Sequence, residues 1–188
     1  DKQDKKVLLW DKNLIFFPRK IKNQFCFMHR IKPDIQIVAV NVIENLSEKF
    51  WKDYFLHFDE HIALASKHEH ELSYLGGGCP PIETEFGWLL IYHGVCDKRE
   101  GCVYSACAAL FDLENPQKEI SRLPYPLFKP EYEWELEGKV NNVCFPTGTV
   151  VIEDLLYIYY GAADERIACA SVNLPALLAE LLNYTNEK

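Results

Sequence analysis

One sequence pattern occurs three times in this chain, and this repeat limits the possible folds more than any other feature. In each copy a proline is followed by a turn and then by a strand of aromatic and aliphatic residues that ends in a polar side chain. Pro18 and Pro81 lie 63 residues apart, and Pro81 and Pro146 lie 65 residues apart. A period of this kind indicates a chain built from repeated supersecondary units.

Each copy has the pattern of an antiparallel β-meander. Tyr, Phe, Val and Ile fill the predicted strands, and Gly, Pro, Asn and Asp bound them, as expected for strands joined by tight turns. The turns are expected at 21–23, 84–87 and 152–154, and a further strand of each copy at 35–40, 103–111 and 166–172. Helical periodicity is nearly missing except at 175–182, where Asn173 can cap a helix and Pro175 fits its first turn.

These units predict an all-β chain with a short C-terminal helix. Four-stranded sheets that repeat along a chain stack radially into a β-propeller, because neighbouring sheets bury each other's faces. The repeat units are expected at 13–60, 76–125 and 140–172, within a single partial propeller domain over residues 1–188. Insertions would explain why the period exceeds the ~40–50 residues of common blades. Three blades do not close a ring, so we expect that a further part completes the propeller.

The charge balance excludes two classes of partner. The chain has 20 Lys and Arg against 28 Asp and Glu, a net charge of −8, whereas nucleic acids and anionic membranes bind basic surfaces. No apolar run approaches the ~18 residues of a membrane-spanning helix.

Seven cysteines, an odd number, lie mostly in apolar segments, which indicates reduced thiols and a cytoplasmic protein. An N-terminal signal outside this sequence would instead allow a periplasmic or secreted protein.

The repeat also aligns polar residues. Equivalent strand ends carry His29 with Arg30 in the first copy, His93 in the second, and Tyr160 followed by Asp164 in the third. One such residue alone is more often satisfied by the backbone of a neighbouring loop. Three polar residues at the same repeat position favour a shared binding site, since equivalent positions of successive blades face one channel. Directional donors and acceptors in an aromatic pocket suit a polyhydroxylated ligand.

Two further motifs resemble known sites without fitting them. Residues 76–78 are three glycines, but no Lys-Ser or Lys-Thr follows, so we expect a close backbone approach at the start of a blade rather than a phosphate loop. Residues 67–71, Lys-His-Glu-His-Glu, lack the spacing of metal ligands and predict a solvated outer strand. Cys79 has no paired base in the sequence. We therefore expect neither a metal site nor a cysteine nucleophile.

Five motifs together resemble those of glycoside hydrolase family 130. The resemblance runs from about residue 13 to residue 172 in the family's order, and five motifs in register are hard to obtain by chance. The motifs are Gly-Gly-Cys-Pro-Pro-Ile-Glu-Thr at 77–84, Gly-Trp-Leu-Leu-Ile-Tyr-His-Gly-Val at 87–95, Leu-Phe-Asp-Leu-Glu-Asn-Pro at 110–116, Asn-Val-Cys-Phe-Pro-Thr-Gly at 142–148 and Tyr-Tyr-Gly-Ala-Ala-Asp at 159–164.

The resemblance implies a five-bladed β-propeller enzyme that cleaves β-mannosides with inversion, of which this chain covers about three blades. Most members are phosphorylases that release mannose 1-phosphate, and others hydrolyse β-1,2-linked mannosides. An oligosaccharide substrate is implied, with inorganic phosphate as co-substrate of the phosphorylases and with no metal or organic cofactor. In inverting chemistry a carboxylic acid assists the leaving group while phosphate or water attacks the opposite face. The family's general-acid Asp precedes the matched stretch and has no counterpart here.

The resemblance also implies roles for individual residues. Three positions match those around the mannosyl unit next to the cleaved bond: His29, Asp164 and, as an aromatic wall, Phe145. Three others match positions that hold phosphate in the phosphorylases: Arg30, His93 and Tyr104. Arg and His suit that second role because they supply charge-assisted donors.

Two departures from the family pattern favour water over phosphate. The phosphorylases carry a Lys just before the glycine-rich turn, where Tyr74 stands, and a basic and amide pair before the first matched strand, where we place Trp10 and Asp11. An Asp there would repel phosphate. Hydrolysis is therefore our first interpretation, a phosphorylase the alternative, and a non-catalytic carbohydrate-binding propeller a second alternative. Hydrolysis needs a carboxylate base to activate water, and Glu83 and Glu135 are the candidates.

The sugar pocket gives the first prediction. Asp164 follows small residues that allow its carboxylate to reach the channel. If it accepts hydrogen bonds from mannose hydroxyls, Asp164→Ala in the full-length protein should weaken mannoside binding by roughly 1.5–3 kcal/mol, the size of hydrogen bonds to charged groups. Calorimetric titration measures the change. Unaltered affinity in a variant that still folds would remove Asp164 from the site.

Overall fold

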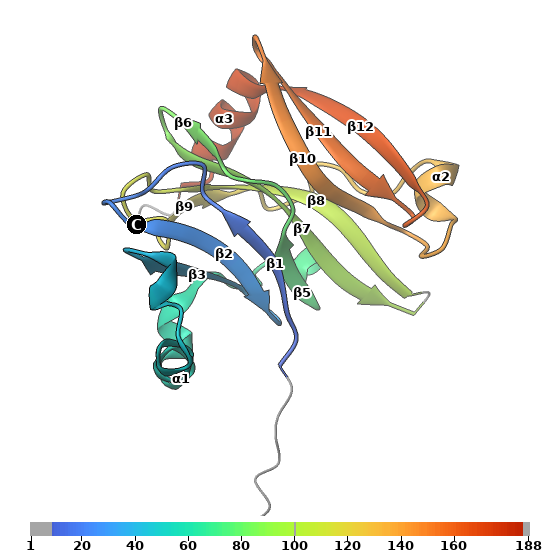
Figure 1. The fold of residues 1–188 in the computed structure, drawn as a ribbon. Helices are drawn as coiled ribbons and strands as arrows, with labels where there is room; N and C mark the ends of the chain where they lie inside the picture. The colour runs from blue at the N-terminus through green and yellow to red at the C-terminus, as the bar shows by residue number, and fades with distance from the viewer. Residues whose placement is uncertain (1–8, 100, 186–188) are drawn as a thin grey trace, which may run out of the picture.

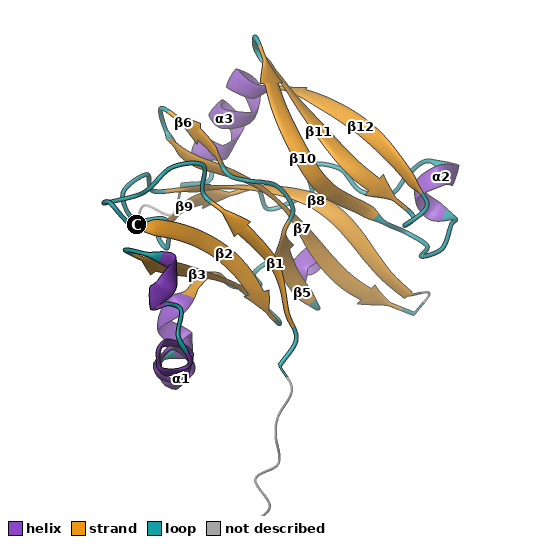
Figure 2. Cartoon of the chain, in the orientation of Figure 1, coloured by secondary structure: helices purple, strands orange, loops and turns teal. Residues whose placement is uncertain are grey.

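The computed structural model describes residues 9–99 and 101–185, which form three antiparallel sheets in succession along the chain (Figures 1 and 2). The first sheet has the order β1-β2-β3-β4. Its strands are β1 (Asp11–Phe16), β2 (Phe25–Ile31), β3 (Ile35–Val40) and β4 (Ile62–Leu64). Between β3 and β4 the chain forms helix α1 (Glu48–Leu56), flanked by the 3-10 turns η1 (Ile43–Asn45) and η2 (Phe58–His61).

The second sheet is built around one long hairpin. Its order is β5-β7-β8-β9, and β6 also pairs with β7. The elements are η3 (Glu69–Glu71), β5 (Tyr74–Gly77), β6 (Ile82–Thr84), β7 (Gly87–Lys98), β8 (Gly101–Phe111) and β9 (Glu119–Arg122). Strands β7 and β8 stay in register from the pair Trp88 and Phe111 to the pair Lys98 and Gly101, so this hairpin spans the whole height of the sheet.

The third sheet has the order β10-β11-β12. Its strands are β10 (Cys144–Ile152), β11 (Leu155–Ala162) and β12 (Arg166–Asn173), preceded by the short helix α2 (Glu133–Leu136) and followed by α3 (Leu174–Leu182). The helix expected at 175–182 is confirmed: the Asn173 side chain accepts a hydrogen bond from Ala176 N, and Pro175 lies in the first turn. The strands and turns expected from the repeat are also confirmed, within about two residues.

Helix α1 contradicts the expectation that helix is confined to the C-terminus. Its residues are rich in aromatics, which intrinsically favour strands. Two effects favour the helix instead: the Ser47 hydroxyl caps it by accepting from Phe50 N, and Tyr54 is buried. Tyr54 packs with Phe27, Val38 and other apolar residues of the first sheet. Burial against the sheet thus determines this element, as it does for most helices in proteins.

The expected solvated strand at 67–71 is also wrong. This segment forms η3, and Glu71 at its end is fully buried. The Glu71 carboxylate accepts hydrogen bonds from the backbone N–H groups of Lys67 and His68 at 3.0 Å, from the Tyr92 hydroxyl at 2.5 Å and from Arg122 Nη1 at 2.9 Å. Burial raises the pKa of Glu71, but the Arg122 charge and these hydrogen bonds outweigh it and keep the pKa below its ordinary value.

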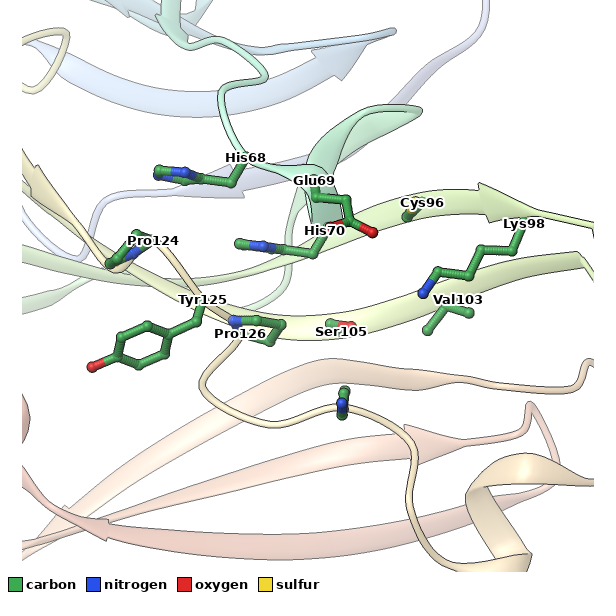
Figure 3. Close-up of a pocket in the computed structure, with 11 residues that line it drawn as sticks. His68, Glu69, His70, Cys96, Lys98, Val103, Ser105, Pro124, Tyr125 and Pro126 are labelled. Carbon is green, nitrogen blue, oxygen red and sulfur yellow. The ribbon is translucent and has the colours of Figure 1, made fainter.

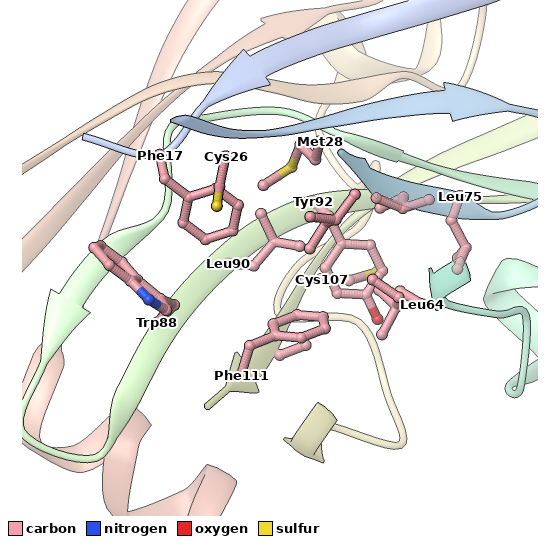
Figure 4. Packing of buried hydrophobic residues seen from close by; sticks show 14 of the residues in the cluster. Phe17, Cys26, Met28, Leu64, Leu75, Trp88, Leu90, Tyr92, Cys107 and Phe111 are labelled. Carbon is pink, nitrogen blue, oxygen red and sulfur yellow. The ribbon is translucent and has the colours of Figure 1, made fainter. Parts of the chain in front are cut away.

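Strand β7 is buried on both faces, and this places a core on each side of the second sheet. Trp88, Leu90 and Tyr92 point toward the first sheet and form one cluster (Figure 4). Leu89 and Ile91 point the other way and pack with residues of the third sheet and α3. A strand buried on both faces carries a continuous apolar run rather than an alternating one, as residues 88–92 do.

The third sheet leaves one face uncovered. The residues on it are apolar and largely exposed: Val150, Ile152, Leu155, Tyr159 and Ile167. The strand register places these five side chains on the same side of β10, β11 and β12. Large exposed apolar patches usually mark a surface that packs against something else. Among the described residues, no helix is long and apolar enough to cross a membrane.

The buried Glu71 carboxylate gives the second prediction. Replacing it by alanine leaves four donors without their acceptor and removes one partner of a buried ion pair, so Glu71→Ala should lower the free energy of unfolding by roughly 3–5 kcal/mol. Urea unfolding measures the loss. As a control, Glu83→Ala removes one partner of the exposed Arg19–Glu83 ion pair and should leave the midpoint nearly unchanged. Equal effects of the two substitutions would contradict a special role for Glu71.

Candidate functional site

All three sheets contribute to one polar cavity of about 320 Å³. The cavity lies where β2, β7 and β8 meet the beginning of β10 and the turn after β11. It is lined by Lys12, Asn13, Arg30, Tyr74, His93, Tyr104, Val140, Val143, Phe145 and Asp164. Five of the six substrate-binding residues named from the sequence are therefore brought together. The repeat argument thus located a shared cavity, although Tyr160 and His29 do not line it.

Arg30 has the chemistry of a ligand-binding residue. It is 6% exposed, and its Nε and Nη1 atoms have no hydrogen-bond partner in the protein. Its guanidinium lies 4.7 Å from the centroid of the Tyr74 ring. A buried cation that lacks partners is costly unless something else supplies them. Together with Lys12, it therefore makes this cavity suitable for an anion or a strongly polar ligand.

His93 is held in the cavity by close packing. A Cβ atom on Gly76 would lie 2.4 Å from the His93 ring, so the glycine-rich strand β5 provides the space that the imidazole occupies. The ring lies 4.4 Å from that of Phe145, centroid to centroid. Burial, and then the Arg30 charge, lower the pKa of His93 to about 3. His93 is therefore neutral near pH 7, and its Nδ1 has no partner in the protein.

Tyr74 and Tyr104 complete the polar wall. Their hydroxyl groups hydrogen-bond to each other, and burial raises the pKa of Tyr104, so this group stays protonated and can donate. Lys32 Nζ lies 3.6 Å from the Tyr74 ring centroid, and burial followed by the Arg30 charge lowers its pKa. The Tyr74 ring is thus in contact with two cations.

His29 lies behind the cavity rather than in it. Its Nδ1 is 2.9 Å from Asp11 Oδ1 and its Nε2 is 2.6 Å from the Tyr54 hydroxyl. Since a carboxylate only accepts, Nδ1 donates to Asp11 and Nε2 accepts from Tyr54. Both ring nitrogens are therefore occupied within the chain. The adjacent Arg30 points to the opposite face of β2, as neighbouring strand residues do, and this is why the cavity receives Arg30.

Trp10 and Asp11, which we placed from the sequence at the basic and amide positions, do not line the cavity. Lys12 and Asn13, a cation and an amide, line the cavity. Asp11 pairs with His29 instead. The cause is local: the register of β1 shifts between Lys12 and Ile15, and Asn13 has a φ of +57°. A bulge of this kind breaks the alternation of a strand and allows two successive side chains to reach one face.

Neither candidate base lies in the cavity. Glu83 is on another surface, where its two oxygens accept from Arg19 at 2.7 and 2.8 Å. Glu135 is buried: it accepts from the backbone N–H groups of Glu131 and Tyr132 and, at 2.6 Å, from the Tyr160 hydroxyl. Backbone hydrogen bonds and Tyr160 offset burial and lower the pKa of Glu135. It is a structural carboxylate, and no local residue pattern predicts that its oxygens are occupied.

A second cavity of about 350 Å³ lies on the opposite face of the β7–β8 hairpin (Figure 3). The parallel imidazoles of His68 and His70, with centroids 5.7 Å apart, form one side of it. Burial lowers the pKa of both histidines. Over residues 9–99 and 101–185, no group of three or more His, Cys, Asp or Glu side chains is placed to hold a metal ion. The imidazoles therefore pack as neutral rings.

The family model described as beta-1,4-mannooligosaccharide phosphorylase matches residues 2–187. The chain belongs to glycoside hydrolase family 130. A family 130 relative, the 1,2-beta-oligomannan phosphorylase of Thermoanaerobacter sp. (strain X514), is 37% identical over 164 residues, which are 87% of this chain and 51% of the relative. The chain thus spans about half the length of the curated relatives it matches.

Two solved structures extend the comparison within family 130. The structure of β-1,2-mannobiose phosphorylase from Listeria innocua, in complex with β-1,2-mannobiose, matches with a TM-score of 0.75 and 29% identity, over 91% of this chain and 46% of that one. A second, of family 130 glycoside hydrolases that target β-1,2 mannosidic linkages in Candida mannan, matches with a TM-score of 0.65 and 23% identity, over 87% of this chain and 48% of that one. This second likeness shows the fold alone.

His93 gives the third prediction. The ordinary pKa of His is about 6.5, and the unfolded chain takes up a proton below that pH, whereas folded His93 does not until about pH 3. The stability that His93 contributes is therefore complete above pH 6.5 and decreases as the pH falls. Between pH 7.5 and pH 5, the acid-induced loss of unfolding free energy should be about 2 kcal/mol smaller in His93→Asn than in the parent.

Urea unfolding at the two pH values measures this difference. His57→Asn is the matched control, because His57 lies on the surface at the end of α1, and it should retain the parent's pH dependence. A parent and a His93→Asn variant that lose the same stability on acidification would contradict the inferred neutral state.

Proposed function

We propose that the family 130 protein containing this chain is an inverting phosphorylase that cleaves β-mannosides and releases mannose 1-phosphate. The observation that carries the proposal is Arg30, a buried guanidinium whose Nε and Nη1 have no partner in the protein. Phosphate offers acceptor oxygens and negative charge, which match these donors. The names of the relatives at 37% and 29% identity, both phosphorylases, support the same conclusion.

One of the two departures that favoured hydrolysis loses its basis. Asp11, which would repel phosphate, is turned toward His29, and the cavity receives Lys12 and Asn13 in its place. The candidate water-activating carboxylates, Glu83 and Glu135, are held in other hydrogen bonds. Phosphate needs no such base, because it is already a nucleophile at neutral pH. Phosphorolysis, the alternative in the sequence interpretation, is therefore the better supported reaction.

The residues of the cavity have different roles in binding phosphate and the sugar. Arg30 and Lys12 offset the charge of phosphate, neutral His93 and the Tyr104 hydroxyl add hydrogen bonds without charge, and Asp164 accepts from sugar hydroxyls. Phosphate oxygen attacks the anomeric carbon from the face opposite the leaving group. The bond from that carbon to the glycosidic oxygen breaks, and a general acid protonates the departing oxygen. We assign that acid to no residue of this chain.

We also propose that the complete protein is a five-bladed β-propeller. Radial packing of three sheets, with β7 buried on both faces, supports this architecture. The uncovered apolar face of the third sheet, with Ile152 and Ile167 at 57% and 83% exposure, is suited to pack against a further blade. The oligosaccharide would then enter along the channel where the strand ends of all blades converge.

Product analysis tests the reaction. With β-1,2- or β-1,4-mannobiose, the full-length enzyme should form mannose 1-phosphate in proportion to added millimolar phosphate.

Arg30→Gln should raise the KM for phosphate about 100-fold, the effect of losing a hydrogen-bonded cationic partner, and should change the KM for the mannoside less. Arg19→Gln, which removes an exposed cation elsewhere, is the matched control. Free mannose as the sole product, independent of phosphate, would restore hydrolysis, and mannoside binding without turnover would favour the non-catalytic alternative.

A further inference from the structure

An exposed pair of aromatic rings stands close to the cavity. Tyr132 and Trp134, at the start of α2, stack with a centroid distance of 4.6 Å and an interplanar angle of 3°. Their exposed fractions are 57% and 41%, so neither ring serves the core. Two parallel rings exposed to solvent offer a flat π-face, and such a face is the surface on which the axial C–H groups of a pyranose stack.

Buried contacts fix this aromatic pair in place. The Glu135 carboxylate accepts from Tyr132 N at 3.0 Å and from the Tyr160 hydroxyl at 2.6 Å. One buried carboxylate thus anchors the segment that carries both rings. Such preorganisation reduces the entropy that binding would otherwise cost.

The aromatic pair borders a groove with the polar groups that sugars require. The groove measures about 400 Å³ and is lined by Glu133, Trp134, Glu137 and Arg166. Carboxylates accept hydrogen bonds from hydroxyl groups, and a guanidinium donates to them in a fixed planar geometry. An aromatic face beside two acceptors and one multiple donor complements one pyranose ring better than it complements an apolar or a purely anionic ligand.

The groove and the cavity take lining residues from the same β11–β12 hairpin. Asp164 lines the cavity, and Arg166, two residues later in the same β11–β12 hairpin, lines the groove. Val140 lines the cavity and donates its N–H to Ala163 O at 3.2 Å. Figure 1 shows α2 beside the end of this hairpin. An oligosaccharide that leaves the cavity across the hairpin turn therefore meets the aromatic pair.

We propose that this groove is an outer subsite, in which a mannosyl unit of a longer substrate stacks on Trp134 while Glu133, Glu137 and Arg166 bind its hydroxyl groups. The inference rests on the proposed function, because it assumes that the cavity holds one end of a mannoside. It adds a preference for chain length: a longer oligosaccharide gains the contact with Trp134 that a disaccharide held in the cavity lacks.

Calorimetric titration of the full-length protein with mannobiose and mannohexaose, in both the β-1,2 and the β-1,4 series, tests the subsite. Trp134→Ala should weaken hexaose binding about five- to tenfold, the contribution of one stacked ring, and leave biose binding unchanged. Trp134→Phe keeps a π-face and should restore most of the affinity. Phe86→Ala, which removes an exposed aromatic ring on another surface, is the matched control and should change neither affinity.

The outcomes separate the subsite from the function on which it rests. If the parent protein binds no mannoside of either length, the proposed function fails. If it binds both lengths and Trp134→Ala leaves the hexaose affinity unchanged, the subsite is wrong and the function stands. Equal weakening of biose and hexaose by Trp134→Ala would also overturn the subsite, since the residue would then act through the cavity. Tryptophan fluorescence gives a second readout: hexaose should shift the emission of the parent, and Trp134→Phe should lose that shift.

Discussion

The buried Glu71 carboxylate is the interaction on which the second sheet, and with it the site, depends. It gathers donors from the backbone before η3, from Tyr92 on β7 and from Arg122 on β9. Because η3 leads directly into β5, the same contact fixes the glycine strand whose Gly76 lies against His93. A charge buried in the core is stabilising only when it is fully paired, and here the pairing sets the position of a functional strand.

Two buried arginines show how the same side chain serves structure and function. The Arg122 guanidinium donates to Ala65 O, Glu71 and Glu119, and these contacts are internal to the fold. Arg30 is buried to nearly the same extent, but its Nε and Nη1 lack any partner in the protein. Native structures leave few buried donors unsatisfied. Partner count, more than burial or residue type, therefore separates the ligand-binding arginine from the structural one.

The repeat in the sequence predicted the strands, most turns and the convergence of strand ends on one cavity, because all three depend on local residue patterns. It could not predict that Lys12 and Asn13 share a face, since a backbone bulge decides this. It could not separate His29 from Arg30, because the face that each neighbour occupies depends on sheet packing. Helix α1 and the burial of Glu71 were missed for the same reason: tertiary contacts determine both.

The cavity takes residues from all three sheets, and this links ligand binding to tertiary assembly. No single sheet holds more than part of the donor set. A ligand bound to Lys12, His93 and Asp164 together acts as a removable cross-link between blades and stabilises the packed state by mass action, in proportion to the logarithm of its concentration. Ligand affinity therefore reports on how well the blades pack. A substitution that loosens a sheet interface far from the cavity would lower the affinity for the ligand without contacting it.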